Sequence, residues 1–423
     1  MRSSLFDNFS TRFIANVSWS VGAEFIAKIV RIASLFALAW ALPIAQYGVA
    51  MLALAFIDIL RLLMRCSAGA QVIQCSTTEF KQTLFNGVGL QWILCVGLMA
   101  VQILLGWLAA AFYNQPLLFD LLLWSSPVFL GFPIVCSRVF VITRNNQLRI
   151  ISTVTAIALS LENASVAVSA FAGAGVYAIV IGKFVFTIVW IIAFLRQPAP
   201  ALDGHFELSK MCSMFIASTK IALSESARAI KLHIDLLVAG KLMTPEFVGI
   251  YSVARNASSG VTQSFLMAFE NALYPYLCKL NRAGQSHKFA KMLAVLSVVL
   301  TLGLTLQAAL VPFYLPILFG EKWSMSISAA TWLCVAMIPS AILSMVCTSV
   351  RAKAQYSLEI ALRLTGTFSV LSWLVVVQAN NADAFAQATL SGNALGFVAG
   401  LIVIAVYVTL ISAPMRKEKP YDI

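Results

Sequence analysis

Long, continuous apolar runs dominate this sequence, separated by polar breaks or breaks that contain proline and glycine. A run of about 20 apolar residues crosses a bilayer as a helix, whereas the strands of a barrel would alternate over about ten residues. Only 11% of the residues are charged, against roughly 25% in soluble domains. The sequence therefore predicts an all-α polytopic membrane protein with about twelve transmembrane helices. We expect them near residues 13–42, 47–64, 84–111, 117–138, 150–171, 175–195, 211–240, 247–278, 289–311, 325–350, 357–378 and 385–411.

A polar connection near the middle of the chain divides the predicted helices into six and six. Residues 196–210 contain prolines and a glycine, which suit an exposed linker. A faint internal repeat supports the division, since a shift of 201 residues aligns Gly48 with Gly249. We therefore expect an N-terminal bundle at 1–203 and a C-terminal bundle at 204–423, arranged around a central cavity.

The distribution of lysine and arginine predicts the orientation. With the N-terminus taken as cytoplasmic, 18 of the 29 basic residues fall in predicted cytoplasmic segments, two fall outside and nine lie within predicted helices. This asymmetry follows the positive-inside rule, so we expect both termini to be cytoplasmic. The net charge of +12 belongs mostly to this topology and does not indicate nucleic-acid binding.

The sequence contains no motif typical of an enzyme. No Walker A, HExxH or GxSxG pattern occurs, and the loops are too short for a soluble catalytic domain. The eight cysteines are scattered without a CxxC pair and read as small buried apolar residues. We expect no metal or other cofactor and no catalytic residue.

Charged residues inside the predicted helices are the candidates for a functional site. Each would cost about 2.5–3.5 kcal/mol at the centre of a bilayer, so it must face protein or a wet cavity. In the first predicted helix, Glu24, Lys28 and Arg31 stand at positions i, i+4 and i+7. At 3.6 residues per turn these three share an arc of roughly 60°. One face of this helix is therefore polar.

The predicted helix at 211–240 is the most charged one. Apart from His233, its charged residues share an arc of about 140°; they are Lys220, Glu225, Arg228, Lys231 and Asp235. This helix is the counterpart of the first one in the proposed repeat. Two cationic stripes would meet between the bundles if the repeat is real.

Two interpretations of these charges remain open. Local pairing at i,i+3 or i,i+4 would neutralise some of them, namely Glu24 with Lys28, Glu225 with Arg228, Asp58 with Arg61 and Glu359 with Arg363. We favour this structural role for Asp58 with Arg61 and for Glu359 with Arg363. A cationic excess on the first and seventh helices favours a functional cavity instead. Glu162 and Lys183 receive no assignment from the sequence.

The predicted site follows from that excess. The basic candidates are Lys28, Arg31, Arg228, Lys231 and Arg255. A secondary transporter also needs titratable or ion-binding groups in its cavity. The carboxylates that could couple transport to an ion are Glu24, Glu225 and Asp235.

Residues 233–259, HIDLLVAGKLMTPEFVGIYSVARNASS, carry a family resemblance through Asp235, Gly240, Gly249, Tyr251 and Ala254. This segment resembles the seventh-to-eighth helix region of Wzx-type polysaccharide flippases. These flippases belong to the multidrug/oligosaccharidyl-lipid/polysaccharide (MOP) exporter superfamily. The segments at 47–51, 270–280 and 315–335 are similar to further landmarks of that family.

The resemblance implies a role in the synthesis of a surface polysaccharide such as O-antigen, capsule or exopolysaccharide. Such flippases move undecaprenyl-diphosphate-linked oligosaccharides from the cytoplasmic to the periplasmic leaflet of the bacterial inner membrane, by alternating access. The implied partners are the lipid-linked oligosaccharide, the bilayer and a polysaccharide polymerase. The basic candidates would then be the substrate-binding residues, because a diphosphate needs guanidinium and ammonium partners.

Two other functions compete with this one. A cation-coupled multidrug exporter of the same superfamily would be expected to have an acidic cavity, which the basic excess disfavours. A membrane-embedded polysaccharide polymerase would usually carry a long periplasmic loop, whereas the predicted external connection at 311–324 is short. The sugar, the coupling ion and the oligomeric state do not follow from the sequence.

We predict that a cysteine introduced at Gln197 or at Ser286 is protected from a membrane-impermeant thiol reagent added to intact cells, because the positive-inside rule places both positions in the cytoplasm. Labelling should appear only after the membrane is permeabilised. A variant without the native cysteines supplies the background. Labelling of either position in intact cells would contradict the predicted orientation.

Overall fold

The computed structural model of this protein describes residues 29–65, 69–76, 78–145, 147–260, 286–353 and 355–412, with the single residues 27, 262, 266, 273 and 277. Within these ranges some side chains are not described, including all those of residues 220–231. The chain divides into two compact units, Met1–Lys241 and Leu242–Ile423. The boundary expected at residues 203 and 204 stays a prediction, because these units reflect packing and do not test an internal repeat.

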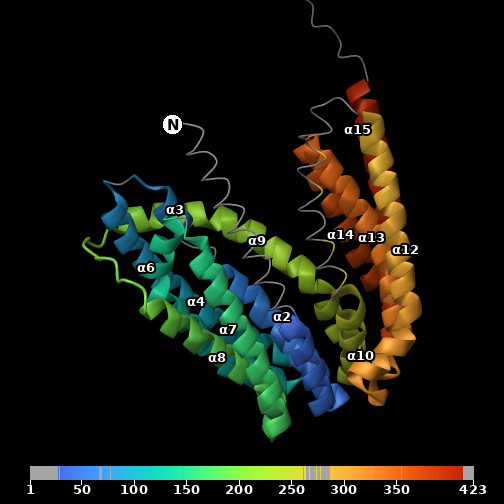
Figure 1. Cartoon of the computed structure of the whole chain (residues 1–423), viewed down its shortest axis with the longest axis horizontal. Helices are drawn as coiled ribbons and strands as arrows, with labels where there is room; N and C mark the ends of the chain where they lie inside the picture. Colours follow the sequence, from blue (N-terminus) through green and yellow to red (C-terminus); the bar gives the residue numbers. More distant parts are fainter. Residues whose placement is uncertain are drawn as a thin grey trace, which may run out of the picture. The chain divides into compact units, whose positions relative to one another are not determined.

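The first unit is built from helices. They are Ile29–Ala41, α2 (Ile44–Arg65), α3 (Gly69–Gln74), α4 (Phe80–Tyr113), α5 (Pro116–Ser125), α6 (Gly131–Arg144), α7 (Leu148–Ser169), α8 (Ala178–Leu195) and α9 (Leu208–Leu242). A short helix, η1 (Ser126–Leu130), joins α5 to α6, while η2 (Ala170–Ala174) and η3 (Gly175–Tyr177) join α7 to α8. Helix α8 packs against α7 and α6, and α6 packs against α4 (Figure 1).

The second unit is also helical. Its elements are α10 (Pro245–Arg255), η4 (Asn256–Gly260), α12 (Ser286–Phe319), η5 (Glu321–Trp323), α13 (Ser326–Ala352), α14 (Tyr356–Val377) and α15 (Ala382–Ser412). Helix α13 is central, since it packs against α10, α12, α14 and α15.

Each of the twelve predicted apolar segments overlaps one or more of these helices, and no strand occurs among the described residues. The predicted all-α membrane fold is therefore confirmed. Eight described segments are long and apolar enough to cross a membrane, and one of these, Arg149–Leu195, contains both α7 and α8. Charged residues recur along helix α9.

The helix ends follow local chemistry. Pro116 and Pro245 occupy the first turns of α5 and α10, where a missing N–H is tolerated and φ is already helical. Asn114 ends α4 with a left-handed φ of 54°, and its N–H donates to Ala110 O. The chain can therefore reverse after α4 and enter α5 within two residues.

Apolar side chains from several helices form the core of the first unit. Phe129, Phe132 and Phe140 belong to it, together with residues of α2, α4, α7 and α8 and with Met211 and Met214 of α9. Within α8, the Phe186 and Trp190 rings stack with centroids 5.5 Å apart. This aromatic row gives α8 a rigid inner face.

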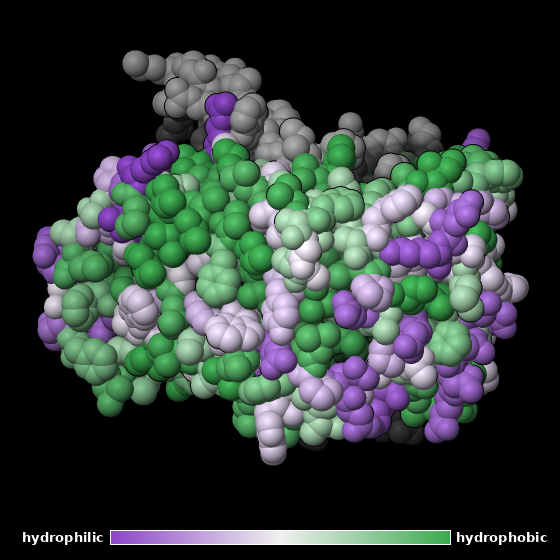
Figure 2. Space-filling view, turned by 90° about the horizontal axis from the view of Figure 1, so that it is seen from below, coloured by the Kyte–Doolittle hydropathy of each residue, from purple (hydrophilic) through white to green (hydrophobic). Residues whose placement is uncertain are grey.

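Other helix faces expose large apolar side chains. Helix α4 exposes Trp92, Ile93, Leu104, Trp107 and Leu108, and α12 and α14 show the same property. Figure 2 shows broad areas of exposed hydrophobic side chains on one face of the molecule. Such surface suits lipid, and exposed tryptophans suit the membrane interface.

Close packing between α7 and α8 depends on Gly182. A Cβ atom added there would lie 3.1 Å from the main-chain oxygen of Glu162 and would clash with Val166. Since main chain cannot move aside as a flexible side chain can, any substitution forces the two helices apart. Gly97 on α4 offers the contrast, because a Cβ there would meet nothing within 4 Å.

We predict that Gly182→Ala lowers the melting temperature of the purified protein in detergent, with a loss of about 1–3 kcal/mol from overpacking. Gly97→Ala is the matched control and should be neutral or slightly stabilising, because alanine favours helix over glycine. Equal melting temperatures for the two variants would contradict the tight α7 and α8 contact.

Candidate functional site

The structure describes the side chains of only some predicted site residues. The described ones are Arg31, Asp235 and Arg255. Glu24 and Lys28 lie outside the described residues. The undescribed side chains on α9 include those of Glu225, Arg228 and Lys231. The site prediction therefore stays a prediction, and Arg31 is its best-defined member.

Five charged side chains of the first unit form what we call the charge cluster. Its members are Arg31 of the helix Ile29–Ala41, Asp58 and Arg61 of α2, Glu162 of α7, and Lys183 of α8. Cations and anions alternate along it. These residues come from four helices. Charges inside an apolar protein are tolerated when they are paired, so the ion pairs join the four helices to one another.

Lys183 is the centre of the charge cluster. Its Nζ lies 2.8 Å from Glu162 Oε1 and 3.1 Å from Asp58 Oδ1. At one end, Arg61 Nη1 lies 3.3 Å from Glu162 Oε2. At the other end, Arg31 Nη2 lies 3.9 Å from Asp58 Oδ2. Three cations and two anions leave the cluster with one net positive charge.

Burial is deepest at the centre of the charge cluster and at its Arg61 end, and it is least at the Arg31 end. The side-chain exposures of Lys183, Glu162 and Arg61 are 6%, 8% and 13%. Asp58 is 27% exposed and Arg31 is 61% exposed. The buried charges of Lys183, Glu162 and Arg61 therefore interact strongly with one another. The ion pair of Arg31 with Asp58 is longer and more exposed, so it is weaker.

Local contacts fix the outer end of the cluster. Ser34, one turn after Arg31, donates a hydrogen bond to Asn163 Oδ1 at 2.9 Å. Asn163 is the neighbour of Glu162 in α7, so this bond holds the first helix beside the cluster. His233 of α9 also interacts electrostatically with Asp58. The predicted seventh helix therefore reaches the same region of the first unit.

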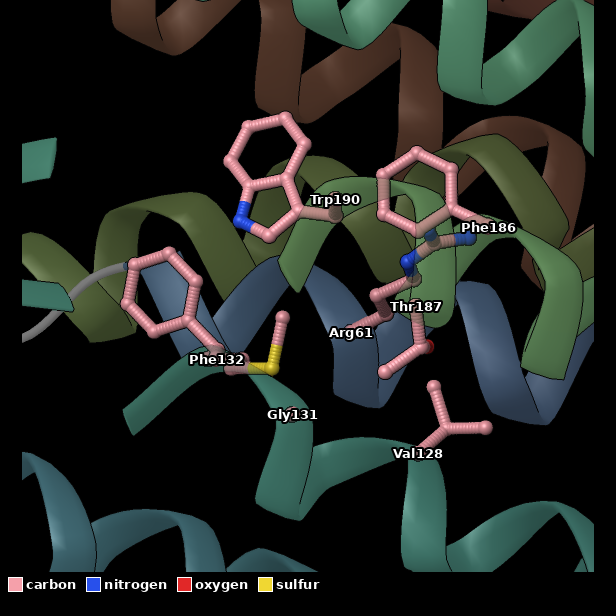
Figure 3. A pocket seen from close by; sticks show the side chains of 8 residues that line it. Arg61, Val128, Gly131, Phe132, Phe186, Thr187 and Trp190 are labelled. Atoms are coloured by element: carbon pink, nitrogen blue, oxygen red, sulfur yellow. The ribbon is translucent and has the colours of Figure 1, made fainter. Parts of the chain in front are cut away.

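A small cavity adjoins the inner end. Its lining consists of Arg61, Met64, Val128, Gly131, Phe132, Phe186, Thr187 and Trp190 (Figure 3). The Arg61 guanidinium lies over the Phe186 ring, with its carbon 3.8 Å from the centroid. Its buried Nη2 has no hydrogen-bond partner in the described part of the chain. Stacking on the ring partly offsets the loss of water around that nitrogen.

The structure tests the predicted local pairs. Glu359 pairs with Arg363 at 2.8 Å, as predicted, and Arg351 of α13 also binds it through two nitrogens. The predicted pair of Asp58 with Arg61 gives way to ion pairs between helices: Asp58 binds Lys183 and Arg31, and Arg61 binds Glu162. Glu162 of α7 and Lys183 of α8, both buried, thus form the ion pairs that the sequence assigned to neighbours one turn apart on α2. The predicted pairs of Glu24 with Lys28 and of Glu225 with Arg228 involve side chains outside the described ones.

Glu162 and Lys183 were missed as a pair by sequence reasoning, although a signal exists. The turn between α7 and α8 contains Gly173 and Gly175, both with positive φ. Glu162 lies 11 residues before Gly173 and Lys183 lies 10 residues after it. In a helical hairpin, equal distances from the turn give equal depths, so opposite charges there are expected to meet.

In the second unit, polar side chains surround the segment after Arg255. This segment, η4, has the wide turns of a π-helix, a feature often found at functional sites. Gln307 of α12 donates to Ser258 O at 3.3 Å and accepts from Thr262 at 2.8 Å, and Tyr314 donates to Ala257 O at 2.9 Å. Helix α12 thus holds the π-helical segment beside Arg255.

No group of three or more potential metal ligands occurs among the described residues. The chemistry available in the charge cluster is ionic: it can pair, exchange or release charged groups.

Comparisons with known proteins identify the family. A family profile described as "Polysaccharide biosynthesis protein" matches residues 37–328, which is more than half of the chain. No curated protein sequence matches significantly.

Solved structures identify the fold. A lipid II flippase MurJ in an inward closed conformation aligns with a TM-score of 0.69 at 14% identity, covering 92% of this chain and 87% of that one. An inward-facing multidrug resistance MATE family transporter of the MOP superfamily aligns with a TM-score of 0.61 at 14% identity, covering 90% and 96%. At these identities the likeness shows the fold.

Family and fold agree with the sequence resemblance, because the profile is that of a polysaccharide biosynthesis family and the two matched structures are a flippase and a transporter. The chain belongs to the polysaccharide biosynthesis protein family, and its helical fold is similar to that of the MurJ flippase and of the MATE transporter.

Proposed function

We propose that this protein is a flippase for a lipid-linked oligosaccharide. The cargo is an undecaprenyl-diphosphate-linked oligosaccharide, moved by alternating access from the cytoplasmic to the periplasmic leaflet of the bacterial inner membrane. The product serves the synthesis of O-antigen, capsule or exopolysaccharide, and a polysaccharide polymerase is the partner that would use it. Both termini are cytoplasmic in this proposal.

One observation carries the proposal. Arg31, in the first apolar helix, is 61% exposed and holds Asp58 at 3.9 Å. An arginine at such a position persists only where protein, water or an anion meets it. In a member of a polysaccharide biosynthesis family, the diphosphate of a lipid-linked sugar is the anion that fits.

The physical properties of the cargo divide between protein and lipid. The diphosphate requires charge-assisted hydrogen bonds, which guanidinium groups supply in a bidentate geometry. The polyprenyl chain can remain in the bilayer beside the exposed apolar faces of helices such as α4. The protein therefore needs to shelter only the headgroup and the sugar.

The proposed substrate site combines the basic residues of the first and seventh predicted helices with one of the eighth. Its members are Lys28, Arg31, Arg228, Lys231 and Arg255. Glu24, Glu225 and Asp235 are the proposed ion-coupling residues. Arg31 and Arg228 should matter most, because lysine cannot reproduce the bidentate contact of arginine.

The fold is also that of a multidrug transporter, so export of cationic drugs is the competing function. Charge argues against it. The charge cluster carries three cations and two anions, and a net positive site repels a cationic drug.

We predict that the purified protein in liposomes moves labelled lipid-linked oligosaccharide between leaflets. The reason is that the fold and the cationic cluster suit translocation of an anionic lipid and contain no enzyme motif. A membrane-impermeant glycosidase would measure transfer, since it cleaves only outward-facing glycan. Protein-free liposomes are the control. Transport of a cationic dye without lipid transfer would favour the drug exporter.

We further predict that Arg31→Ala and Arg228→Ala each reduce this transfer by about tenfold or more, as expected for the loss of a charge-assisted bond of about 1.5–3 kcal/mol. Arg31→Lys should retain part of the activity. Arg196→Ala is the matched control, because Arg196 is exposed at the end of α8. The arginine site would be refuted if both alanine variants and the double variant transferred lipid at the wild-type rate, with equal amounts of protein in the liposomes.

A further inference from the structure

Asp58 lies between two cations of very different character. On one side Lys183 Nζ is 3.1 Å from Oδ1, and this lysine is only 6% exposed. On the other side Arg31 Nη2 is 3.9 Å from Oδ2, and this arginine is 61% exposed. The first contact is short and buried, whereas the second is long and open. Asp58 itself is 27% exposed, so it joins the buried and the open part of the charge cluster.

This asymmetry decides what happens if Arg31 moves away. A buried carboxylate that loses its last cation becomes an uncompensated charge, which is strongly unfavourable. Asp58 would instead keep Lys183, and it also interacts with His233. Lys183 in turn is held by Glu162 at 2.8 Å, and Glu162 is held by Arg61 at 3.3 Å. The departure of Arg31 therefore leaves two cations and two anions paired within the first unit.

We propose that Asp58 is a positioning residue that holds Arg31 in the empty protein and competes with the cargo phosphate for it. Lys183 is the substitute partner that keeps this competition weak. The inference rests on the proposed function, since it assigns the diphosphate as the anion that takes Arg31. Asp58 and Lys183 thereby set how readily the protein accepts and releases its cargo.

The proposal separates two substitutions that a purely structural cluster would not separate. Asp58→Asn removes the competitor of the phosphate while Lys183 keeps Glu162, so it should strengthen binding. Lys183→Met removes the substitute partner, so Asp58 should hold Arg31 more tightly and binding should weaken. A cluster that only stabilises the fold would give losses for both variants.

The test measures binding of undecaprenyl diphosphate to the full-length protein in detergent at low ionic strength, with neutral undecaprenol as the ligand control. We expect Asp58→Asn to lower the Kd about two- to fivefold and Lys183→Met to raise it by a similar factor, since a partly exposed ion pair contributes up to about 1 kcal/mol. The double variant Asp58→Asn with Lys183→Met should bind like Asp58→Asn alone, because Lys183 acts on Arg31 only through the Asp58 carboxylate.

Two controls isolate the role of Arg31. In an Arg31→Ala background, Asp58→Asn should no longer strengthen binding. Glu359→Gln also removes one membrane-embedded carboxylate, but in the second unit, where it pairs with Arg351 and Arg363. It should leave the Kd unchanged, which separates release of Arg31 from a general gain of positive charge.

The outcomes separate the two proposals. If wild-type protein does not prefer undecaprenyl diphosphate to undecaprenol, the proposed function fails. If it does, and Arg31→Ala weakens binding while Asp58→Asn weakens it or leaves it unchanged, the inference is overturned and the proposed function stands. Asp58 and Glu162 both lose their lysine partner in Lys183→Met, so this variant is the one at risk of misfolding. The opposite sign expected for Asp58→Asn decides the matter without it.

Discussion

The buried ion pair between Glu162 and Lys183 is the contact on which the charged interior of the first unit depends. It joins α7 to α8 at 2.8 Å, and both side chains are less than a tenth exposed. Neither could remain charged there alone, since an isolated ion in a medium of low dielectric constant is too unfavourable. Because Lys183 also reaches Asp58, and Glu162 also reaches Arg61, α2 is drawn into the same network. The α7 and α8 hairpin thus provides the base from which charges extend outward.

Packing around Gly182 gives this pair its geometry. Gly182 immediately precedes Lys183 and lies against the main chain of Glu162, so the close helix approach and the short ion pair belong to one contact. On the next turns of α8, Phe186 lies under Arg61 and continues into the aromatic row. Apolar packing and ion pairing are therefore not separate layers here. The same helix face supplies both, and it limits how far the inner charges can move.

The sequence predicted the helices better than the site because the two depend on different ranges of interaction. Apolar runs and breaks such as Pro116 and Pro245 act locally, so the helix positions could be read directly. The pair of Glu359 with Arg363 is also local and was found. Pairing of Arg61 with Glu162 spans 101 residues and depends on which helices become neighbours. Only the symmetric placement of Glu162 and Lys183 about Gly173 carried that information in the sequence.

The charge imbalance of the cluster links the fold to the proposed transport. Its two carboxylates balance the charge of two of its three cations. The most exposed cation, Arg31, has the longest ion pair. Lys183 and Arg61 are fixed by desolvation and by packing, so the excess charge falls on Arg31. An excess placed on a buried member would destabilise the unit, whereas an excess on an exposed arginine is tolerated because water or an anion can approach it. In the proposed transport, this excess positive charge lies on the residue that exchanges Asp58 for the cargo phosphate.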